Sequence, residues 1–135
     1  MTPGEIIERS SLLASREEVK AAVDRMAEQV NAHYGDRPIV LLIVMTGAVM
    51  PAAWLAARLR MPVQMDFIHA TRYSGATKGG EIEFRVPPRL NLQDEHVLIV
   101  DDIYDIGLTL QMIEKYCVAR GAASVNSAVL VRKIH

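Results

Sequence analysis

Residues 97–110 combine a short apolar run with acidic, glycine and threonine residues. The run at 97–100 leads into Asp101 and Asp102, and Asp105 follows three residues later. Carboxylates spaced in this way suit ribose hydroxyls, a magnesium ion or proton transfer, and the spacing leaves these three uses open. The structural alternative is a strand end with solvated aspartates and a threonine that caps the next helix.

The loop that follows these carboxylates has the composition of a phosphate-binding loop. It precedes a helical pattern, and a helix N-terminus offers free backbone amides and the positive end of its dipole. Gly107 permits a close approach of the ligand, and the Thr109 side chain adds a hydroxyl. We therefore expect a phosphate to be cradled by Asp105, Ile106, Gly107, Leu108 and Thr109.

Apolar runs that alternate with helical stripes place this loop in an α/β fold. The expected helices span 16–34, 48–60 and 110–121, and a capping box at 15–18 opens the first of them. The expected strands span 39–45, 63–68, 97–100 and 125–131. This order is typical of a doubly wound, mostly parallel sheet with flanking helices, in which ligands bind beyond the carboxyl ends of the strands.

One segment departs from the alternation of strands and helices. Residues 71–80 are polar and contain glycine, 81–86 alternate as a half-exposed strand does, and Pro87 and Pro88 end that pattern. We expect a flexible hairpin loop at about 71–90, inserted into a single domain that spans residues 1–135.

Composition excludes several classes of partner. The chain has 15 basic and 16 acidic residues, which gives no charge excess for nucleic acid or for a polybasic membrane anchor. Its apolar runs are far shorter than the roughly 20 residues of a membrane span. The single cysteine, Cys117, cannot form an internal disulfide, and the N-terminus lacks a signal-peptide pattern, so a cytoplasmic location is expected.

The pattern at 97–110 resembles the phosphoribosyl-pyrophosphate signature of type I phosphoribosyltransferases. That signature has four apolar residues, two acidic residues, two apolar residues, then Asp, Thr, Gly and a closing Thr. Ile106 stands where the family usually has threonine, which leaves phosphate binding to the backbone amides and Thr109. The resemblance implies the family's core fold, the substrate phosphoribosyl pyrophosphate and the cofactor Mg²⁺.

Three further segments resemble parts of the hypoxanthine-guanine branch of this family. Thr46 and Gly47 are similar to its pyrophosphate-binding loop, with Ala48 in place of a second glycine, although a simple strand-to-helix turn would also explain them. Arg72 and Tyr73 are similar to its flexible catalytic loop, where Tyr73 aligns with the family's tyrosine and Arg72 replaces a serine. An ordinary surface hairpin is the alternative there.

The last strand ends in a basic pair. Lys133 aligns with the lysine that contacts the exocyclic oxygen of 6-oxopurines, and a shift of one residue would give Arg132 that role. A basic strand end on the surface is the structural alternative.

The resemblance is closest to bacterial hypoxanthine-guanine phosphoribosyltransferases. It implies purine salvage, in which 5-phosphoribose is transferred from phosphoribosyl pyrophosphate to N9 of hypoxanthine or guanine, giving IMP or GMP and pyrophosphate. Asp105 would be the general base at the purine N7, and Asp101 and Asp102 would hold the ribose hydroxyls and Mg²⁺. The family is usually a homodimer or homotetramer.

Family members continue past the position of His135, so we expect the C-terminal part of the family domain to be absent from this sequence. This keeps a regulatory module that binds phosphoribosyl pyrophosphate or a nucleotide open as the alternative function. A structural α/β protein with a vestigial site is the third hypothesis. Product formation with hypoxanthine separates the transferase hypothesis from the regulatory module and from the structural protein. The sequence does not rank hypoxanthine, guanine and xanthine.

Overall fold

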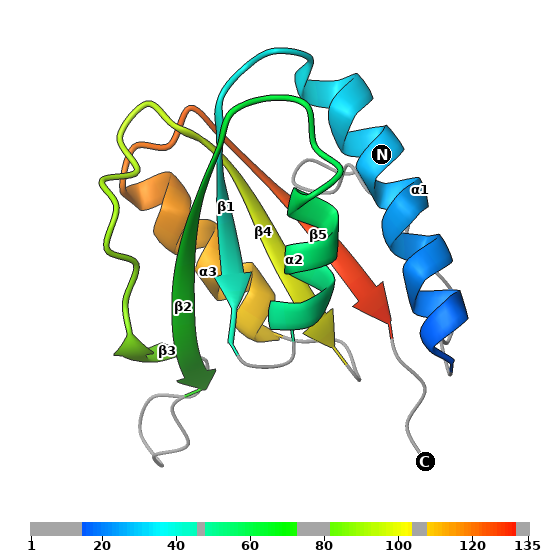
Figure 1. Cartoon of the computed structure of the whole chain (residues 1–135). Coiled ribbons are helices and arrows are strands. Elements are labelled where there is room, and N and C mark those ends of the chain that lie inside the picture. Colours follow the sequence, from blue (N-terminus) through cyan, green and yellow to red (C-terminus); the bar gives the residue numbers. More distant parts are fainter. Residues whose placement is uncertain (1–14, 46–47, 73–81, 104–107, 132–135) are drawn as a thin grey trace.

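The computed structural model describes residues 15–45, 48–72, 82–103 and 108–131, with the side chains at 70–72, 82–86, 102–103, 108–109 and 131 left out. Helices and strands alternate along these residues (Figure 1). The helices are α1 (Arg16–Tyr34), α2 (Val49–Ala56) and α3 (Leu108–Ala119). The strands are β1 (Ile39–Val44), β2 (Val63–Arg72), β3 (Ile82–Val86), β4 (His96–Ile103) and β5 (Ser124–Val131).

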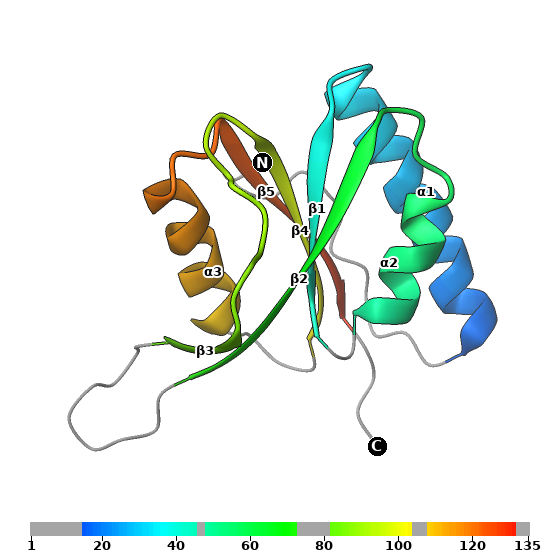
Figure 2. The same cartoon turned by 60° about the vertical axis from the view of Figure 1, so that its left-hand side comes forward.

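The strands form one sheet in the order β3-β2-β1-β4-β5. Neighbouring strands from β2 to β5 run parallel, and β3 pairs antiparallel with the end of β2. Helices α1 and α2 cover one face of the sheet and α3 covers the other (Figure 2). The expected doubly wound, mostly parallel α/β fold is therefore confirmed.

Helix α1 begins at the predicted capping box. The Ser15 hydroxyl accepts a hydrogen bond from the Glu18 amide at 3.1 Å, and the Ser15 amide donates to the Glu18 carboxylate at 2.9 Å. The helix ends at Tyr34, where Gly35 adopts a φ of 63° that glycine tolerates without strain. Within the described residues, no helix is both long and apolar enough to cross a membrane.

Helix α2 ends at Ala56, before the predicted end at residue 60. The chain tightens there, since the Arg58 amide donates to the Leu55 carbonyl three residues earlier. The Asn31 side chain of α1 then binds the Arg58 carbonyl and the Arg60 amide, both of which a longer helix would orient differently. A contact between two helices therefore overrides the local helix propensity.

Strand β2 extends beyond the predicted residues 63–68 to Arg72. Its last residues pair with the predicted hairpin arm, with Thr71 opposite Glu83 and Arg72 opposite Ile82. The prediction that the loop begins at residue 71 was therefore wrong by two residues. Antiparallel pairing with β3 supplies the hydrogen-bond partners that extend β2, and a polar, glycine-containing sequence does not indicate such pairing.

Strand β1 lies at the centre of the sheet, and all six of its residues are buried. Alternate residues therefore contribute to two separate cores, one on each face. The core beneath α1 and α2 includes Leu41, Leu98 and Leu130. The core beneath α3 includes Leu42, Ile113 and the predicted core residue Cys117.

Candidate active site

The sheet order places a topological switch point between two central strands. Helix α2 connects β1 to β2 over one face of the sheet, and α3 connects β4 to β5 over the other. The chain therefore leaves β1 and β4 in opposite directions, although these strands are neighbours with Ile43 opposite Val100. In sheets of this kind ligands bind outside the carboxyl ends of the strands at such a switch point.

Two of the predicted acidic residues belong to β4, next to this switch point. Asp101 pairs with Val129, and Asp102 pairs with Leu130. The Asp101 side chain is only 7% exposed. A carboxylate this close to an apolar core is costly unless polar groups or a ligand compensate it.

The strand and the helix that the sequence predicts around these carboxylates are present. Strand β4 ends at Ile103 and α3 begins at Leu108, two residues before the predicted start at residue 110. Leu108 and Thr109 thus belong to the first turn of α3, where backbone amides have no partner within the helix. The remaining predicted phosphate-binding residues, Asp105, Ile106 and Gly107, lie outside the described residues.

The other predicted site residues follow the carboxyl ends of the remaining parallel strands. Arg72 is the last residue of β2, and its backbone is paired with β3. Thr46 and Gly47 come shortly after β1, Tyr73 directly after β2, and Arg132 and Lys133 after β5. These five residues lie outside the described part of the chain, so their roles stay predictions.

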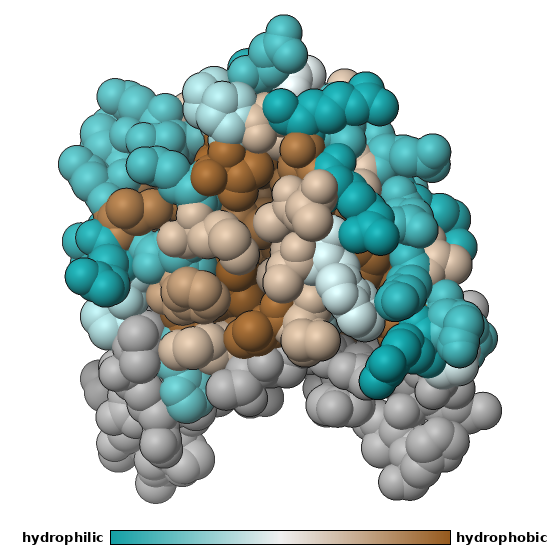
Figure 3. Space-filling view, viewed as in Figure 1, coloured by the Kyte–Doolittle hydropathy of each residue, from teal (hydrophilic) through white to brown (hydrophobic). Residues whose placement is uncertain are grey.

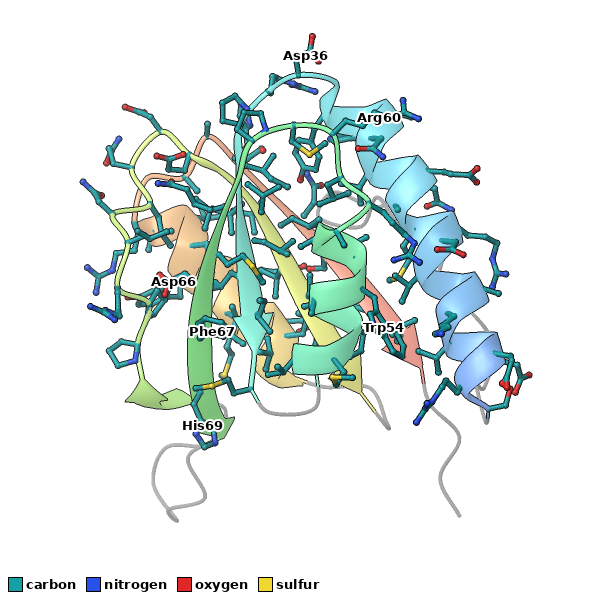
Figure 4. All side chains as sticks on the ribbon, viewed as in Figure 1. Asp36, Trp54, Arg60, Asp66, Phe67 and His69 are labelled. Atoms are coloured by element: carbon teal, nitrogen blue, oxygen red, sulfur yellow. The ribbon has the colours of Figure 1, made fainter. Side chains whose placement is uncertain are left out.

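Asp66, in the middle of β2, is a buried polar residue that sequence reasoning missed. Its side chain is 4% exposed, and one carboxylate oxygen accepts a hydrogen bond from the Phe67 amide at 2.8 Å. The other oxygen accepts from the amides of Arg89 and Leu90, both at 2.8 Å. Asp66 therefore fastens the segment after β3 to β2 (Figure 4). Its signal in the sequence was the single acidic residue of β2, placed between Met65 and Phe67.

The chemistry of the donor groups at the end of β4 fits Mg²⁺. This ion binds one or two carboxylates, keeps several waters and completes its shell with substrate phosphates. Asp101 supplies a carboxylate near the end of β4, and Asp102 is the next residue of the strand. No group of three or more histidine, cysteine or acidic side chains gathers among the described residues, so a cage built from protein ligands alone is absent there.

Comparisons with known proteins agree with this geometry. Residues 10–135 match the family described as phosphoribosyl transferase domain. A hypoxanthine-guanine phosphoribosyltransferase of Leishmania donovani is 32% identical over 131 residues, which cover 90% of this chain and 62% of that protein. One of Staphylococcus epidermidis is 29% identical and covers 91% of this chain and 69% of that protein.

A solved structure supports the same fold. The crystal structure of a Bacillus anthracis hypoxanthine-guanine phosphoribosyltransferase superposes with a TM-score of 0.80 at 27% identity, covering 96% of this chain and 80% of that one. By contrast, the chain spans only 62–63% of the length of the Leishmania and Crithidia relatives.

Proposed function

The chain belongs to the phosphoribosyl transferase domain family, and from this premise we propose that it is a hypoxanthine-guanine phosphoribosyltransferase of purine salvage. It transfers 5-phosphoribose from phosphoribosyl pyrophosphate to N9 of hypoxanthine or guanine, producing IMP or GMP and pyrophosphate. One observation carries the proposal. The Asp101-Asp102 pair and the start of α3 meet at the switch point between β1 and β4, where this fold binds its ligands.

The donor is held by groups that offset its negative charge. The amides at the start of α3, with Gly107 and the Thr109 hydroxyl, bind the 5-phosphate. Asp101 and Asp102 bind the ribose hydroxyls, and their carboxylates stabilise the positive charge that grows on the ribose as pyrophosphate leaves. The buried position of Asp101 strengthens this interaction, because the effective dielectric constant is lower there than in water.

Asp101 and Asp102 are also the residues that would hold Mg²⁺. When bound, the ion neutralises pyrophosphate oxygens and so makes pyrophosphate a better leaving group. Thr46 and Gly47 contact the same pyrophosphate from the end of β1.

The purine is positioned by residues from two other strand ends. Asp105 accepts the proton at the purine N7, and Lys133 contacts the exocyclic oxygen. Arg72 and Tyr73 belong to a loop that closes over the pyrophosphate and excludes water from the reacting ribose. Support for this loop comes from the β2–β3 pairing and from Asp66, which fix the two ends from which it extends.

The test is release of pyrophosphate by the chain with phosphoribosyl pyrophosphate, Mg²⁺ and hypoxanthine or guanine. We expect Asp105→Asn to lower kcat by roughly 10²–10⁴-fold with donor affinity largely retained, because a single general base is removed. The matched control is Asp36→Asn. Asp36 is exposed in the turn before β1, at the amino-terminal end of the parallel strands and opposite the proposed site (Figure 4).

Three results would count against the proposal. Turnover unchanged in Asp105→Asn would remove Asp105 from the role of base. Donor binding that depends on Mg²⁺, without any pyrophosphate release, would assign the chain to the alternative class of a regulatory module that binds phosphoribosyl pyrophosphate or nucleotides. Absence of binding as well would leave a structural protein with a vestigial site.

We propose further that the chain assembles as a homodimer or homotetramer. Four large apolar side chains near α2 and the edge of β2 are exposed, and apolar colour gathers there on the surface (Figure 3). They are Val49, Met50, Met65 and Phe67. Exposed apolar patches mark interfaces, and a two-fold contact can pair one patch with its own copy. Light scattering should show a lower mass for Met50→Glu and an unchanged mass for Val118→Glu, because Val118 is exposed on α3.

We propose that residues 1–135 act as one domain in the cytoplasm, without a nucleic-acid or membrane partner. The balanced charge and the buried thiol of Cys117 support this assignment. Limited proteolysis and fractionation of cells are the corresponding tests.

A further inference from the structure

A second concave site lies on the α3 side of the sheet. It is a surface pocket of about 330 Å³ between the β3–β4 connection and the last turn of α3. Its lining residues are Pro88, Arg89, Leu90, Asn91, Leu92, Tyr116 and Arg120. This volume is at the lower end of the range of about 300–1,000 Å³ that small-molecule sites occupy.

The polar side chains of this pocket include hydrogen-bond donors that are positively charged, Arg89 and Arg120, or neutral, Asn91. Arg89 and Arg120 are both exposed, and neither side chain forms an ion pair with another described residue. The Asn91 side-chain oxygen accepts a hydrogen bond from the Gln93 amide, and its NH₂ group is a neutral donor. No carboxylate lines the pocket, and an anion would therefore meet two guanidinium groups without a competing charge.

One guanidinium is already oriented. The Arg120 guanidinium carbon lies 4.8 Å from the centroid of the Tyr116 ring, in a cation–π contact. Such stacking holds the planar group in place while its edge N–H groups stay available for hydrogen bonds. Less side-chain entropy is then lost when an anion binds.

Two negative features nearby are compensated. The C-terminal end of α3 carries partial negative charge, but the Tyr116 and Cys117 carbonyls are occupied by the Arg120 amide. The Asp66 carboxylate, on the other side of the β3–β4 connection, is satisfied by backbone amides that include those of Arg89 and Leu90. The carboxylate and these two carbonyls therefore already have hydrogen-bond donors within the chain.

The remaining walls are apolar. Leu92 is 3% exposed and closes the base, while Pro88 and Leu90 are half-buried beside it. A site that joins two cationic planar donors to an apolar wall suits a phosphate monoester with a small ring. We propose that this pocket binds small phosphate esters whose organic part is an apolar or aromatic ring.

This pocket is separate from the candidate active site. Helix α3 has 12 residues, a length of about 18 Å, and it begins beside the carboxyl ends of the strands and ends at the pocket. The proposal does not depend on the proposed transferase activity, because none of its residues belongs to that site.

The test is a titration of the ¹⁵N-labelled full chain with phenyl phosphate, followed by the amide signals of 89–92 and 116–120. We expect saturable shifts of these signals and binding about tenfold weaker in Arg120→Gln, since one charge-assisted contact is lost. Lys115→Gln is the matched control, because Lys115 is exposed on the same helix but does not line the pocket. Pyrophosphate release should be the same in both variants.

Three results would overturn the proposal. Shifts confined to residues near the start of α3 would mean that the ester enters only the candidate active site. Equal weakening in Lys115→Gln would indicate attraction by overall charge rather than a built site. Inorganic phosphate binding as tightly as phenyl phosphate would refute the ring-binding part of the pocket.

Discussion

Asp66 allows the sharpest prediction about stability. Its carboxylate accepts three backbone hydrogen bonds at 2.8 Å while only 4% of the residue is exposed. In Asp66→Asn the size is kept, but one oxygen is replaced by an NH₂ group that can only donate. Whichever way the amide turns, at least one of the amides of Phe67, Arg89 and Leu90 then faces another donor.

The magnitude follows from the two losses. A hydrogen bond to a charged group contributes about 1.5–3 kcal/mol and a neutral one about 1 kcal/mol, while a buried donor left unpaired costs about 1–3 kcal/mol. The retained bonds become weaker and one is lost, so we expect the free energy of unfolding to fall by about 2–4 kcal/mol. The control is Asp24→Asn, since Asp24 only forms an exposed pair with Arg58 and such pairs contribute about 0–1 kcal/mol.

Urea unfolding, followed by the fluorescence of the single tryptophan, Trp54, measures this difference. With a slope of about 2 kcal/mol per molar urea, the midpoint should fall by about 1–2 M in Asp66→Asn and by much less in Asp24→Asn. Hydrogen exchange should also accelerate at the amides of Arg89 and Leu90. Equal midpoints in the two variants, or unchanged exchange at these two amides, would refute the reasoning.

Further predictions concern α3 and its C-terminal end. Ile113→Ala should reduce the free energy of unfolding by about 2–5 kcal/mol in urea titrations because Ile113 is fully buried, whereas an equal loss in the exposed control Val118→Ala would contradict this. Gly121→Ala should also destabilise the fold, since φ is +86°, a backbone conformation that residues with a Cβ rarely adopt; a melting temperature equal to that of the parent would argue against it. Burial raises the pKa of the Cys117 thiol from its ordinary value of 9.0 to about 12. The unfolded chain therefore loses this proton first, and stability should decline between pH 9 and 12 by at most about 1.4 kcal/mol per pH unit. Cys117→Ala should lack this part of the decline in urea titrations at each pH, and an identical pH profile would exclude the thiol as its source.

Much of the fold could be predicted because local signals and tertiary structure agree. The capping box fixes the start of α1, and the continuous apolar run at 39–45 indicates β1, which is buried on both faces. The extension of β2 to Arg72 and the early end of α2 depend on partners distant in the sequence, β3 and Asn31. Such pairings leave no local periodicity, so the sequence alone does not indicate them.

The candidate site was predictable to a different extent. Asp101 and Asp102 could be predicted as site residues because they end an apolar run, and a charged group at the end of a buried strand is costly unless a partner or ligand compensates it. Asp66 escaped notice because its partners are backbone amides, which every residue offers and no sequence pattern marks. The pocket beside Tyr116 and Arg120 forms where residues 88–92 meet the end of α3 in the folded chain. The sequence alone therefore does not indicate it.

The pairing of β1 with β4 also has a consequence for the order of folding. These neighbours are separated in the chain by α2, β2 and β3, and parallel strands cannot form a local hairpin. Closing so long a loop is slow, because the entropy is lost before the contact is made. We therefore expect the proposed ligand site between β1 and β4 to be among the last features to form. Recovery of ligand binding during refolding should then lag behind recovery of the helical circular-dichroism signal.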